Sequence, residues 1–365
     1  MRIGVFTFHR ANNYGAVLQA AAFQRYIGKS HAECEIIDYY PNNAIPARFA
    51  ALRSAAKCAV DTLRGRGGME AFIKEKRFEG FRKRNLVLSH DKYLGDGAIK
   101  ARPPRYDVLI SGSDQILNTE LTGCSRAFYL DFDTPAIKVS YASSFGKDVL
   151  NETERELTAS ALSRLERLSM REASGADAVE AILGARPPVV ADPVLLLSPE
   201  EWRMTANKPK KLPERYVCVY AMEDSEALFR AAEAISRKLG VPAVTVKGSP
   251  RARVLGKELN GLGPAEFLGV ISGAEYVVTN SFHGAAFALI FGRKLISAAH
   301  SKRNTRIENL LSEAGVHGRQ LHENEELDEK THVIEGAEHY KNLMPLIERS
   351  KAYIMDALDP EKRRK

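Results

Sequence analysis

The chain has 365 residues, 44% of them apolar and 27% charged, with a formal net charge of +7. One hydrophobic core stops growing at roughly 250–300 residues, so two domains are expected. No apolar run reaches the roughly 18 residues of a membrane span, so we expect a soluble globular protein and not an integral membrane protein.

The positive charge is concentrated in one stretch. Fifteen Lys and Arg but six Asp and Glu lie between Arg48 and Arg105, so this stretch carries +9 and the rest of the chain −2. In principle such a stretch binds nucleic acid or an anionic membrane surface. Its interleaved phenylalanines have the spacing of a helix that docks onto a sheet, and we prefer that explanation for them. The charges then face solvent or lipid headgroups.

The N-terminus and the cysteines indicate a reducing cytoplasm. The chain enters a strand pattern directly after Met1 and shows no export leader. Its cysteines, which are Cys34, Cys58, Cys124 and Cys218, lack C-x-x-C spacing. We therefore expect buried thiols, with neither a disulfide framework nor a zinc site. No histidine cluster occurs, and no metal or cofactor is predicted.

The first half alternates strands and helices. Strands are predicted over residues 2–8, 34–39, 107–110, 138–141, 168–171 and 187–191, and helices over 16–27, 151–168 and 174–183. Gly28 stands where the C′ residue of the first helix is expected. The region 44–100 is predicted to be helical and basic, and prolines and lysines make 206–213 the best linker candidate.

The second half repeats this alternation. Strands are predicted over residues 216–220, 243–246, 276–279 and 294–298, and helices over 224–239, 264–272, 282–291 and 304–313. Alternation of this kind indicates βαβ units and parallel sheets. We predict two doubly wound α/β domains facing a cleft, which the loops at 9–15, 111–115, 143–146, 247–250 and 280–284 should line.

The predicted boundaries place an N-terminal domain at 1–200, with the basic helical region 44–100 as an insertion. A C-terminal domain follows at 214–335, and a C-terminal helix with a basic tail covers 336–365.

His283 is the leading candidate for acid–base chemistry. It follows a predicted strand and opens a helix, where the positive end of the helix dipole favours a neutral imidazole and attracts anions. Such an imidazole can shuttle a proton near pH 7. Alternatively, Asn280 or Ser281 caps the helix and His283 is a half-buried residue without a chemical role. These residues alone leave both interpretations open.

Other polar residues at predicted strand ends also have two interpretations. Arg171 is placed to grip a carboxylate or phosphate, although an Arg-Glu pair is more often a surface ion pair. Asp114 accepts hydrogen bonds from sugar hydroxyls or caps a helix. Asp192, before Pro193, is equally typical of a turn.

Two further places suggest anion binding. The turn at Asn13 and Gly15 presents backbone N–H groups or only reverses the chain, and it lacks both the G-x-G-x-x-G and the Walker pattern. Arg303 and Arg306 lie near a helix start, where the dipole disfavours cations, which indicates an anionic partner or a solvated face.

Together these segments resemble the polysaccharide pyruvyl transferase family. Seven motifs occur in the family's order within about residues 1–315. They are Thr7-Phe8-His9-Arg10-Ala11-Asn12-Asn13-Tyr14-Gly15-Ala16-Val17-Leu18-Gln19, Ser111-Gly112-Ser113-Asp114-Gln115, Tyr141-Ala142-Ser143-Ser144-Phe145-Gly146, Arg171-Glu172, Asp192-Pro193-Val194, Thr279-Asn280-Ser281-Phe282-His283-Gly284 and Arg306-Ile307-Glu308-Asn309-Leu310.

The resemblance implies two Rossmann-like domains of the glycosyltransferase-B kind. It also implies transfer of a pyruvyl group from phosphoenolpyruvate to two hydroxyls of one sugar, giving a ketal. His283 corresponds to the family's catalytic histidine and Arg171 to a donor-binding arginine. Ser281 stands where some members carry a second donor-binding arginine.

The expected site follows from this correspondence. A replacement for the missing arginine is expected from Arg303, Arg306 or Lys247. Donor binding is assigned to these cations together with Asn280, Ser281 and Gly284. Acceptor binding is assigned to Asn13, Tyr14, Gly15, Ser113, Asp114, Gln115 and Ser144.

The leading hypothesis is exopolysaccharide or cell-wall glycan biosynthesis on a lipid-linked acceptor. The basic stretch would attach the protein peripherally to the inner face of the cell membrane, each cation contributing about 1 kcal/mol. One alternative is a glycosyltransferase of the same fold that uses a nucleotide sugar. Another is a non-catalytic protein that binds glycan or nucleic acid through the basic patch.

Overall fold

The computed structural model describes residues 1–30, 32–44, 68–246, 256–300, 304–359 and 361. The chain forms two compact α/β units, each with its own sheet. The N-terminal unit holds the first sheet, Arg82–Leu196 and the C-terminal helix from Leu346 onward. The second unit holds Leu197–Pro345 and the part of helix α3 (Gly68–Asn85) up to Phe81. The last turn of α3, from Arg82 onward, belongs to the N-terminal unit.

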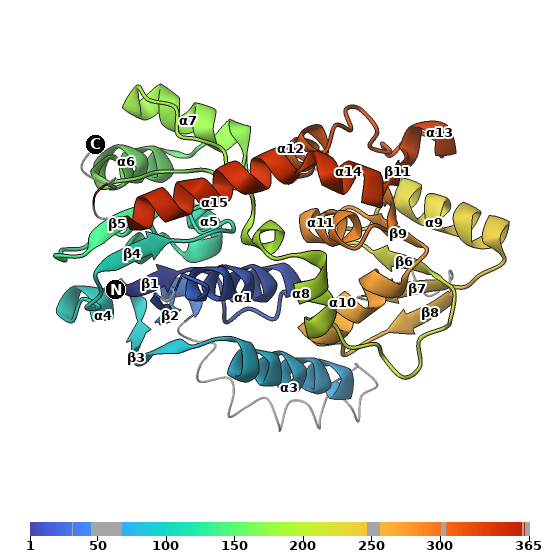
Figure 1. Cartoon of the computed structure of the whole chain (residues 1–365), viewed down its shortest axis with the longest axis horizontal. Helices are drawn as coiled ribbons and strands as arrows, with labels where there is room; N and C mark the ends of the chain where they lie inside the picture. Colours follow the sequence, from blue (N-terminus) through green and yellow to red (C-terminus); the bar gives the residue numbers. More distant parts are fainter. Residues whose placement is uncertain (31, 45–67, 247–255, 301–303, 360, 362–365) are drawn as a thin grey trace. The chain divides into compact units, whose positions relative to one another are not determined.

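The N-terminal sheet is parallel throughout, in the order β3-β2-β1-β4-β5 (Figure 1). Its strands are β1 (Arg2–Phe6), β2 (Glu33–Tyr40), β3 (Leu88–Leu94), β4 (Val108–Ser111) and β5 (Ile137–Ser140). The central β1 and β4 are buried nearly throughout, as strands covered on both faces must be. The strand order reverses beside β1, which is the doubly wound arrangement predicted from the alternation.

The helices of this unit match the predictions only in part. They are α1 (Tyr14–Gly28), η1 (Asn42–Ala44), α4 (Gly95–Ala101), α5 (Thr119–Thr122), η2 (Arg126–Tyr129), α6 (Glu152–Ser160), η3 (Leu162–Arg164), α7 (Ala173–Leu183) and η4 (Pro193–Leu196). The helix predicted over 151–168 stops at Ser160. The strands predicted over 168–171 and 187–191 reduce to isolated bridges at Met170 and Val189.

The C′ role predicted for Gly28 is wrong. Gly28 is the last helical residue of α1, and the cap is Lys29 in a right-handed conformation. The N–H of Lys29 donates to the carbonyls of Tyr26 and Ile27, so the chain leaves the helix through a right-handed turn that needs no glycine.

The region 44–100 is not helical throughout. It contains α3 (Gly68–Asn85), then strand β3 and α4, while 45–67 lie outside the described residues. β3 is an edge strand with the polar sequence LSHDKYL, so its hydropathy pattern is weak and its pairing with β2 decides its conformation. Phe78 and Phe81 are buried, as expected for a docked helix.

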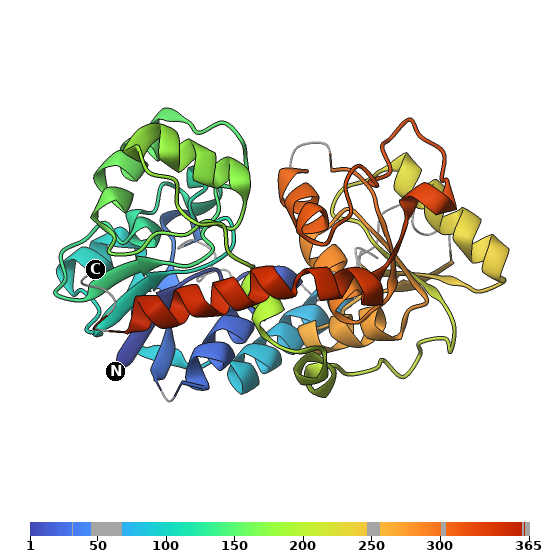
Figure 2. The same ribbon diagram turned by 45° about the horizontal axis from the view of Figure 1, so that its top comes forward.

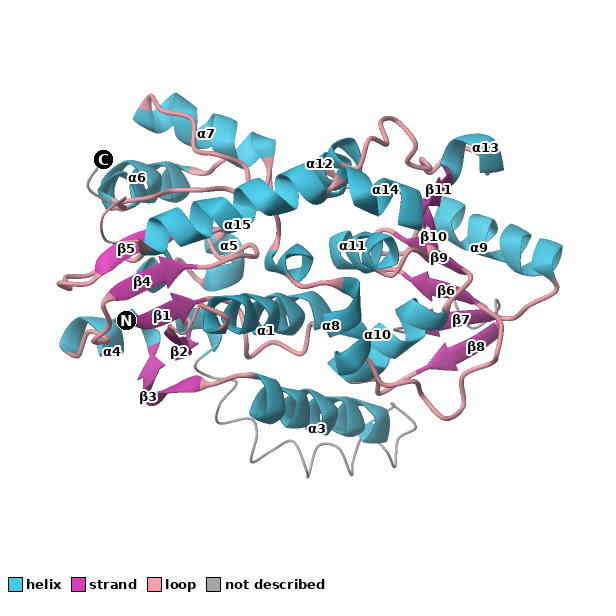
Figure 3. Cartoon of the chain, viewed as in Figure 1, coloured by secondary structure: helices cyan, strands magenta, loops and turns pink. Residues whose placement is uncertain are grey.

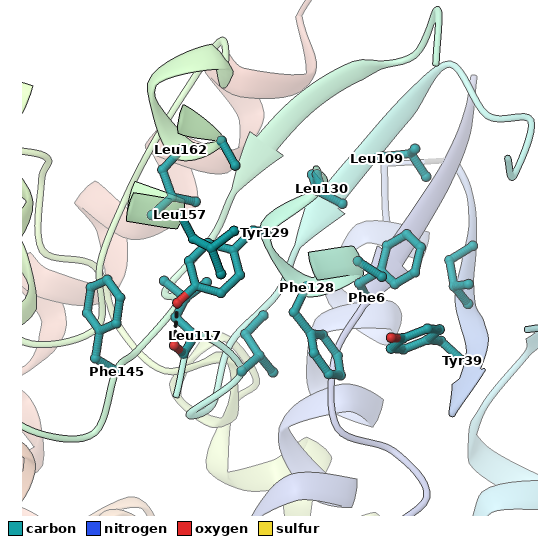
Figure 4. Packing of buried hydrophobic residues seen from close by; sticks show 14 of the residues in the cluster. Phe6, Tyr39, Leu109, Leu117, Phe128, Tyr129, Leu130, Phe145, Leu157 and Leu162 are labelled. Carbon is teal, nitrogen blue, oxygen red and sulfur yellow. Dashed lines mark hydrogen bonds between the residues drawn. The ribbon is translucent and has the colours of Figure 1, made fainter. Parts of the chain in front are cut away.

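Aromatic side chains pack among aliphatic ones in the core of the N-terminal unit (Figure 4). Phe6 and Tyr39 meet edge to face at 5.8 Å between ring centroids, and Tyr39 meets Phe128 in the same way at 5.3 Å. The Tyr129 hydroxyl donates to the Leu117 carbonyl, which satisfies a buried polar group. Burying each such ring stabilises the fold by about 1.5–3 kcal/mol.

The C-terminal sheet has the order β11-β10-β9-β6-β7-β8 and is parallel except for β11 (Figure 3). Its strands are β6 (Val217–Tyr220), β7 (Ala243–Val246), β8 (Gly256–Leu259), β9 (Tyr276–Thr279), β10 (Lys294–Ser297) and β11 (Val333–Glu335). Helices of this unit are α8 (Pro199–Thr205), α9 (Glu226–Leu239), α10 (Pro264–Gly273), α11 (Phe282–Ile290), α12 (Thr305–Glu313), α13 (Glu329–His332) and α14 (Gly336–Asn342). The edge strands β8 and β11 were not among the predicted elements.

The last helix, α15 (Met344–Leu358), returns to the N-terminal unit from Leu346 onward (Figure 2). The Ser350 hydroxyl accepts a hydrogen bond from the Ala191 N–H at 2.8 Å, and the Tyr353 hydroxyl donates to the Ser140 carbonyl at 2.9 Å. Each unit is therefore built from separate segments of the chain, whereas the predicted domains are continuous segments. The linker predicted over 206–213 has no regular structure and lies inside the second unit.

Candidate functional site

A buried arginine surrounded by carboxylates lies where the N-terminal sheet ends. Arg171 follows the bridge at Met170, and its side chain is 2% exposed. Its Nη1 donates to Asp192 Oδ2 at 2.9 Å, and carboxylate oxygens of Asp114 and Glu172 each lie 3.7 Å from the guanidinium. Burial opposes the charge, but these carboxylates raise the pKa of Arg171 above its ordinary value. Arg171 is thus paired within its own unit and is not the surface ion pair considered above.

Asp114 is the most accessible carboxylate of this group. Its side chain is 13% exposed, compared with 1% for Glu172 and none for Asp192. Asp114 has a φ of 74°, which is uncommon for a residue other than glycine, and its Oδ1 accepts from the Gln115 N–H at 2.9 Å. Backbone strain of this kind persists only where surrounding contacts impose it.

Three other residues expected at the acceptor site, which are Ser113, Gln115 and Ser144, lie around Asp114. Ser113 donates to Asp192 Oδ2 at 3.3 Å, and Ser144 donates to Glu172 Oε1 at 2.7 Å. Both serines are buried, and so is Gln115. The two serine side chains bind carboxylates of the protein, and Asp114 is the most exposed carboxylate of this group.

The turn before α1 has a structural role in this state. Asn13 is the N-cap, and its side chain accepts from the Ala16 N–H at 3.2 Å. Tyr14 and Gly15 begin the helix and are buried, while Asn13 is exposed. The Asn12 side chain accepts from Arg82 Nη1 at 3.2 Å, which ties the turn to the end of α3.

In the C-terminal unit, the segment 279–284 makes the tight turn from β9 into α11. Ser281 is the N-cap, and its hydroxyl accepts from the Gly284 N–H at 3.3 Å, as the capping interpretation expected. A Cβ on Gly284 would lie 2.5 Å from Thr279 Oγ1 and 3.0 Å from a Tyr220 ring carbon. Only glycine lets the helix start this close to β6 and β9.

His283 is the second residue of α11 and is 8% exposed. Its ring meets Phe282 edge to face at 5.1 Å between centroids. Because the first turn of a helix carries the positive end of the dipole, this position favours an anion beside the imidazole. Capping by Ser281 and a chemical role for His283 are therefore compatible.

Asn280 binds the neighbouring loop after β6. Its Oδ1 accepts from the Met222 N–H at 2.7 Å, and its Nδ2 donates to the Glu223 carbonyl at 3.0 Å. Asn280 is 1% exposed, and both ends of its side-chain amide bind backbone groups of this loop. Its contribution in the structure is to hold two loops together.

The three cations expected to replace the missing arginine are only partly described. Arg306 is the second residue of α12 and is partly buried. Lys247 and Arg303 lie outside the described residues.

Sequence reasoning missed a histidine–carboxylate pair in the same unit. His300 Nδ1 lies 3.3 Å from Glu223 Oε1, with side chains 15% and 29% exposed. Neither residue belongs to a motif, and they lie far apart along the chain. Their place in the sequence could have indicated them, because each residue comes shortly after the end of a predicted strand of the parallel sheet.

The cysteine prediction holds for Cys218, which is buried, and burial raises its pKa to about 12. It is wrong for Cys124, which is exposed and follows the left-handed Gly123 at the end of α5. Cys58 lies outside the described residues.

Within the described ranges, no group of three or more His, Cys, Asp or Glu side chains is arranged to hold a metal ion. Of the helices that the structure describes, none combines the length and apolar character needed to cross a bilayer.

Two solved structures of UDP-GlcNAc 2-epimerases have a similar fold. A UDP-GlcNAc 2-epimerase from Neisseria meningitidis bound to UDP-GlcNAc has a TM-score of 0.55 and 11% identity, covering 98% of this chain and 99% of the other. A putative UDP-N-acetylglucosamine 2-epimerase from Listeria monocytogenes has a TM-score of 0.51 and 10% identity, covering 97% and 90%. At these identities the likeness shows the glycosyltransferase-B-like fold alone.

The sequence itself gives a more specific comparison. No curated protein sequence shows significant similarity to the chain. The family model for polysaccharide pyruvyl transferase matches residues 13–302, a span that contains Arg171, the Asp114 loop and the 279–284 turn with His283. The chain therefore belongs to the polysaccharide pyruvyl transferase family.

Proposed function

We propose that this enzyme transfers the pyruvyl group of phosphoenolpyruvate to a sugar and closes a pyruvate ketal. Two hydroxyl oxygens of one sugar bond to C2 of the donor, and the bond from C2 to the phosphate oxygen breaks. One hydroxyl proton is balanced by protonation of the C3 methylene, which becomes a methyl group. The other leaves with phosphate.

The observation that carries the proposal is the position of His283 in a chain of this family. Protonation of C3 needs an acid beside an anionic donor. The helix start attracts the anion, and the charge of a bound anion stabilises the imidazolium that the helix dipole alone disfavours. His283 is thus the proposed acid–base group. Ser281, Gly284 and Arg306 are the described residues proposed for the donor side.

The Asp114 group is proposed to bind the acceptor. When its three carboxyl groups are ionised, the cluster around Arg171 carries two net negative charges. Such a cluster repels the phosphate and carboxylate of phosphoenolpyruvate and suits sugar hydroxyls as hydrogen-bond donors. We therefore favour a role for Arg171 in holding the Asp114 loop over the donor contact that the resemblance implies.

The acceptor is proposed to be a lipid-linked glycan precursor reached at the inner membrane surface, with α3 contributing basic charge. Part of that charge is used inside the protein. Arg77 Nη1 donates to the Gly261 carbonyl at 3.1 Å, and Arg82 donates to Asn12. The exposed Lys83 and Arg84 of α3 are the proposed membrane contacts.

The experiment is a transfer assay with phosphoenolpyruvate labelled in the pyruvyl carbons and a library of glycan acceptors. Phosphate release together with label in the acceptor is expected from the natural enzyme, and His283→Gln should lower turnover at least about 100-fold. His317→Gln, an exposed histidine of the same unit, is the control.

A second donor class is tested in parallel. Thermal stabilisation by UDP or CMP sugars, with none by phosphoenolpyruvate and no phosphate release, would replace the proposal by a glycosyltransferase reaction. Glycan binding that His283→Gln leaves intact, without turnover of either donor, would replace it by a binding function.

A further inference from the structure

We propose that His300, oriented by Glu223, is a second catalytic residue that accepts the proton of the attacking sugar hydroxyl. The inference rests on the proposed pyruvyl transfer and assigns a base to complement His283.

Sheet topology brings His300 to the same edge as His283. β10, β9 and β6 are adjacent parallel strands, and Ser297, Thr279 and Tyr220 end them in register. Carboxyl ends of parallel strands meet at one edge of a sheet, where such folds bind ligands. His283 lies four residues beyond the end of β9, and His300 lies three residues beyond the end of β10.

The pair has the geometry of an oriented base. His300 Nδ1 lies 3.3 Å from Glu223 Oε1, so the negative carboxylate favours the tautomer that carries its proton on Nδ1. That tautomer leaves Nε2 as the acceptor. The carboxylate also stabilises the imidazolium that forms when Nε2 takes a proton.

Buried amides hold both partners in place. Asn280 donates to the Glu223 carbonyl at 3.0 Å and accepts from Met222 at 2.7 Å, which fixes the loop carrying the carboxylate. The side-chain Oδ1 of Asn304 accepts from the His300 backbone N–H at 3.2 Å and from Gln320 Nε2 at 3.1 Å. Gln320 in turn reaches Ser297 Oγ at 3.3 Å. Residues from three chain segments therefore support one histidine.

The chemistry explains why a second group is useful. Addition to C2 requires a proton to reach C3 while a proton leaves the hydroxyl oxygen. These two atoms are on different molecules, so one imidazole would have to release its proton before taking the next. With His283 protonating C3 and His300 Nε2 receiving the hydroxyl proton, both transfers accompany formation of the new C–O bond, and no further reactant is needed.

The test uses His300→Ala and Glu223→Gln in the full-length enzyme with phosphoenolpyruvate and the acceptor found above. His300→Ala should lower kcat at least about 100-fold, and imidazole added to the buffer should restore part of it. Glu223→Gln should lower kcat about 10-fold or more while phosphoenolpyruvate affinity and the melting temperature stay near the natural values.

A matched control is available. Glu325 forms another histidine–carboxylate pair in the same unit, 3.7 Å from His332 Nε2, and Glu325→Gln should leave kcat unchanged.

Unchanged kcat in either His300→Ala or Glu223→Gln would overturn the inference while the proposed function stands. A loss in His300→Ala that imidazole does not restore would also overturn it, because that result indicates a structural role. If His300→Ala does not fold, Glu223→Gln decides alone. Absence of pyruvyl transfer in the natural enzyme would instead overturn the proposed function, and this inference with it.

Discussion

Arg171 donates from Nη1 to Asp192 Oδ2 at 2.9 Å, and both side chains are almost completely withdrawn from water. A buried charge that loses its partner costs far more than a surface pair, because it retains its desolvation penalty. We therefore expect Arg171→Ala to lower the free energy of unfolding by about 3–5 kcal/mol in denaturant titrations. Arg186→Ala, which breaks an exposed pair with Asp177, should cost about 1 kcal/mol or less. Equal losses in both variants would contradict this.

The two roles considered for Arg171 can be separated with lysine. Arg171→Lys keeps the positive charge but loses the planar guanidinium group, whose nitrogens lie near the carboxylates of Asp192, Asp114 and Glu172. If Arg171 holds the Asp114 loop, the acceptor KM should rise about 10-fold or more while the dissociation constant of phosphoenolpyruvate changes less than about 2-fold. Calorimetry with the donor alone checks this. Loss of donor affinity would instead establish the donor contact that the resemblance implies.

Gly284 should not tolerate a side chain. A Cβ would lie 2.5 Å from Thr279 Oγ1, an atom that also donates to the Tyr220 carbonyl at 2.6 Å. Relief requires moving α11 or breaking that hydrogen bond, so Gly284→Ala should cost about 1–3 kcal/mol. Gly97→Ala is the control, since nothing lies within 4 Å of its added Cβ and the site is helical. A melting temperature for Gly284→Ala equal to that of the control would refute the clash.

The buried carboxylate of Asp38 should make the stability of the folded protein sensitive to acid. Burial raises its pKa, but hydrogen bonds and charges from His9 and Arg10 outweigh burial and leave the pKa below its ordinary value. A carboxyl group whose folded pKa is depressed stabilises the protein above the unfolded pKa of about 3.9, and this stability is lost as pH falls toward the folded value.

Asp38→Asn should therefore lower the melting temperature at pH 7 and flatten its fall between about pH 5 and 3. Asp177→Asn, at an exposed carboxylate, serves as the control. If the melting temperatures of the natural protein and of Asp38→Asn fall in parallel as pH decreases, the ionisation of Asp38 does not contribute to the acid sensitivity.

The quality of the strand predictions depended on burial. β7 and β9 were predicted with the bounds that the structure has, because inner strands of a parallel sheet are short continuous apolar runs. β3 was wrongly assigned to a helix, and β8 and β11 were missed. These are edge strands whose polar residues face solvent, so their conformation comes from pairing with a neighbour.

Sequence alone determined the fold class, the family and the position of His283 at a helix start, because periodicity, caps and ordered motifs are local properties of the chain. Only the tertiary structure decided which groups surround Arg171, which loop Asn280 holds and that His300 meets Glu223. Those contacts depend on strand order, which places β10 and β6 on either side of β9 although they are far apart in the chain. His283 thus has a local explanation, whereas the groups proposed to act with it are brought together by the sheet.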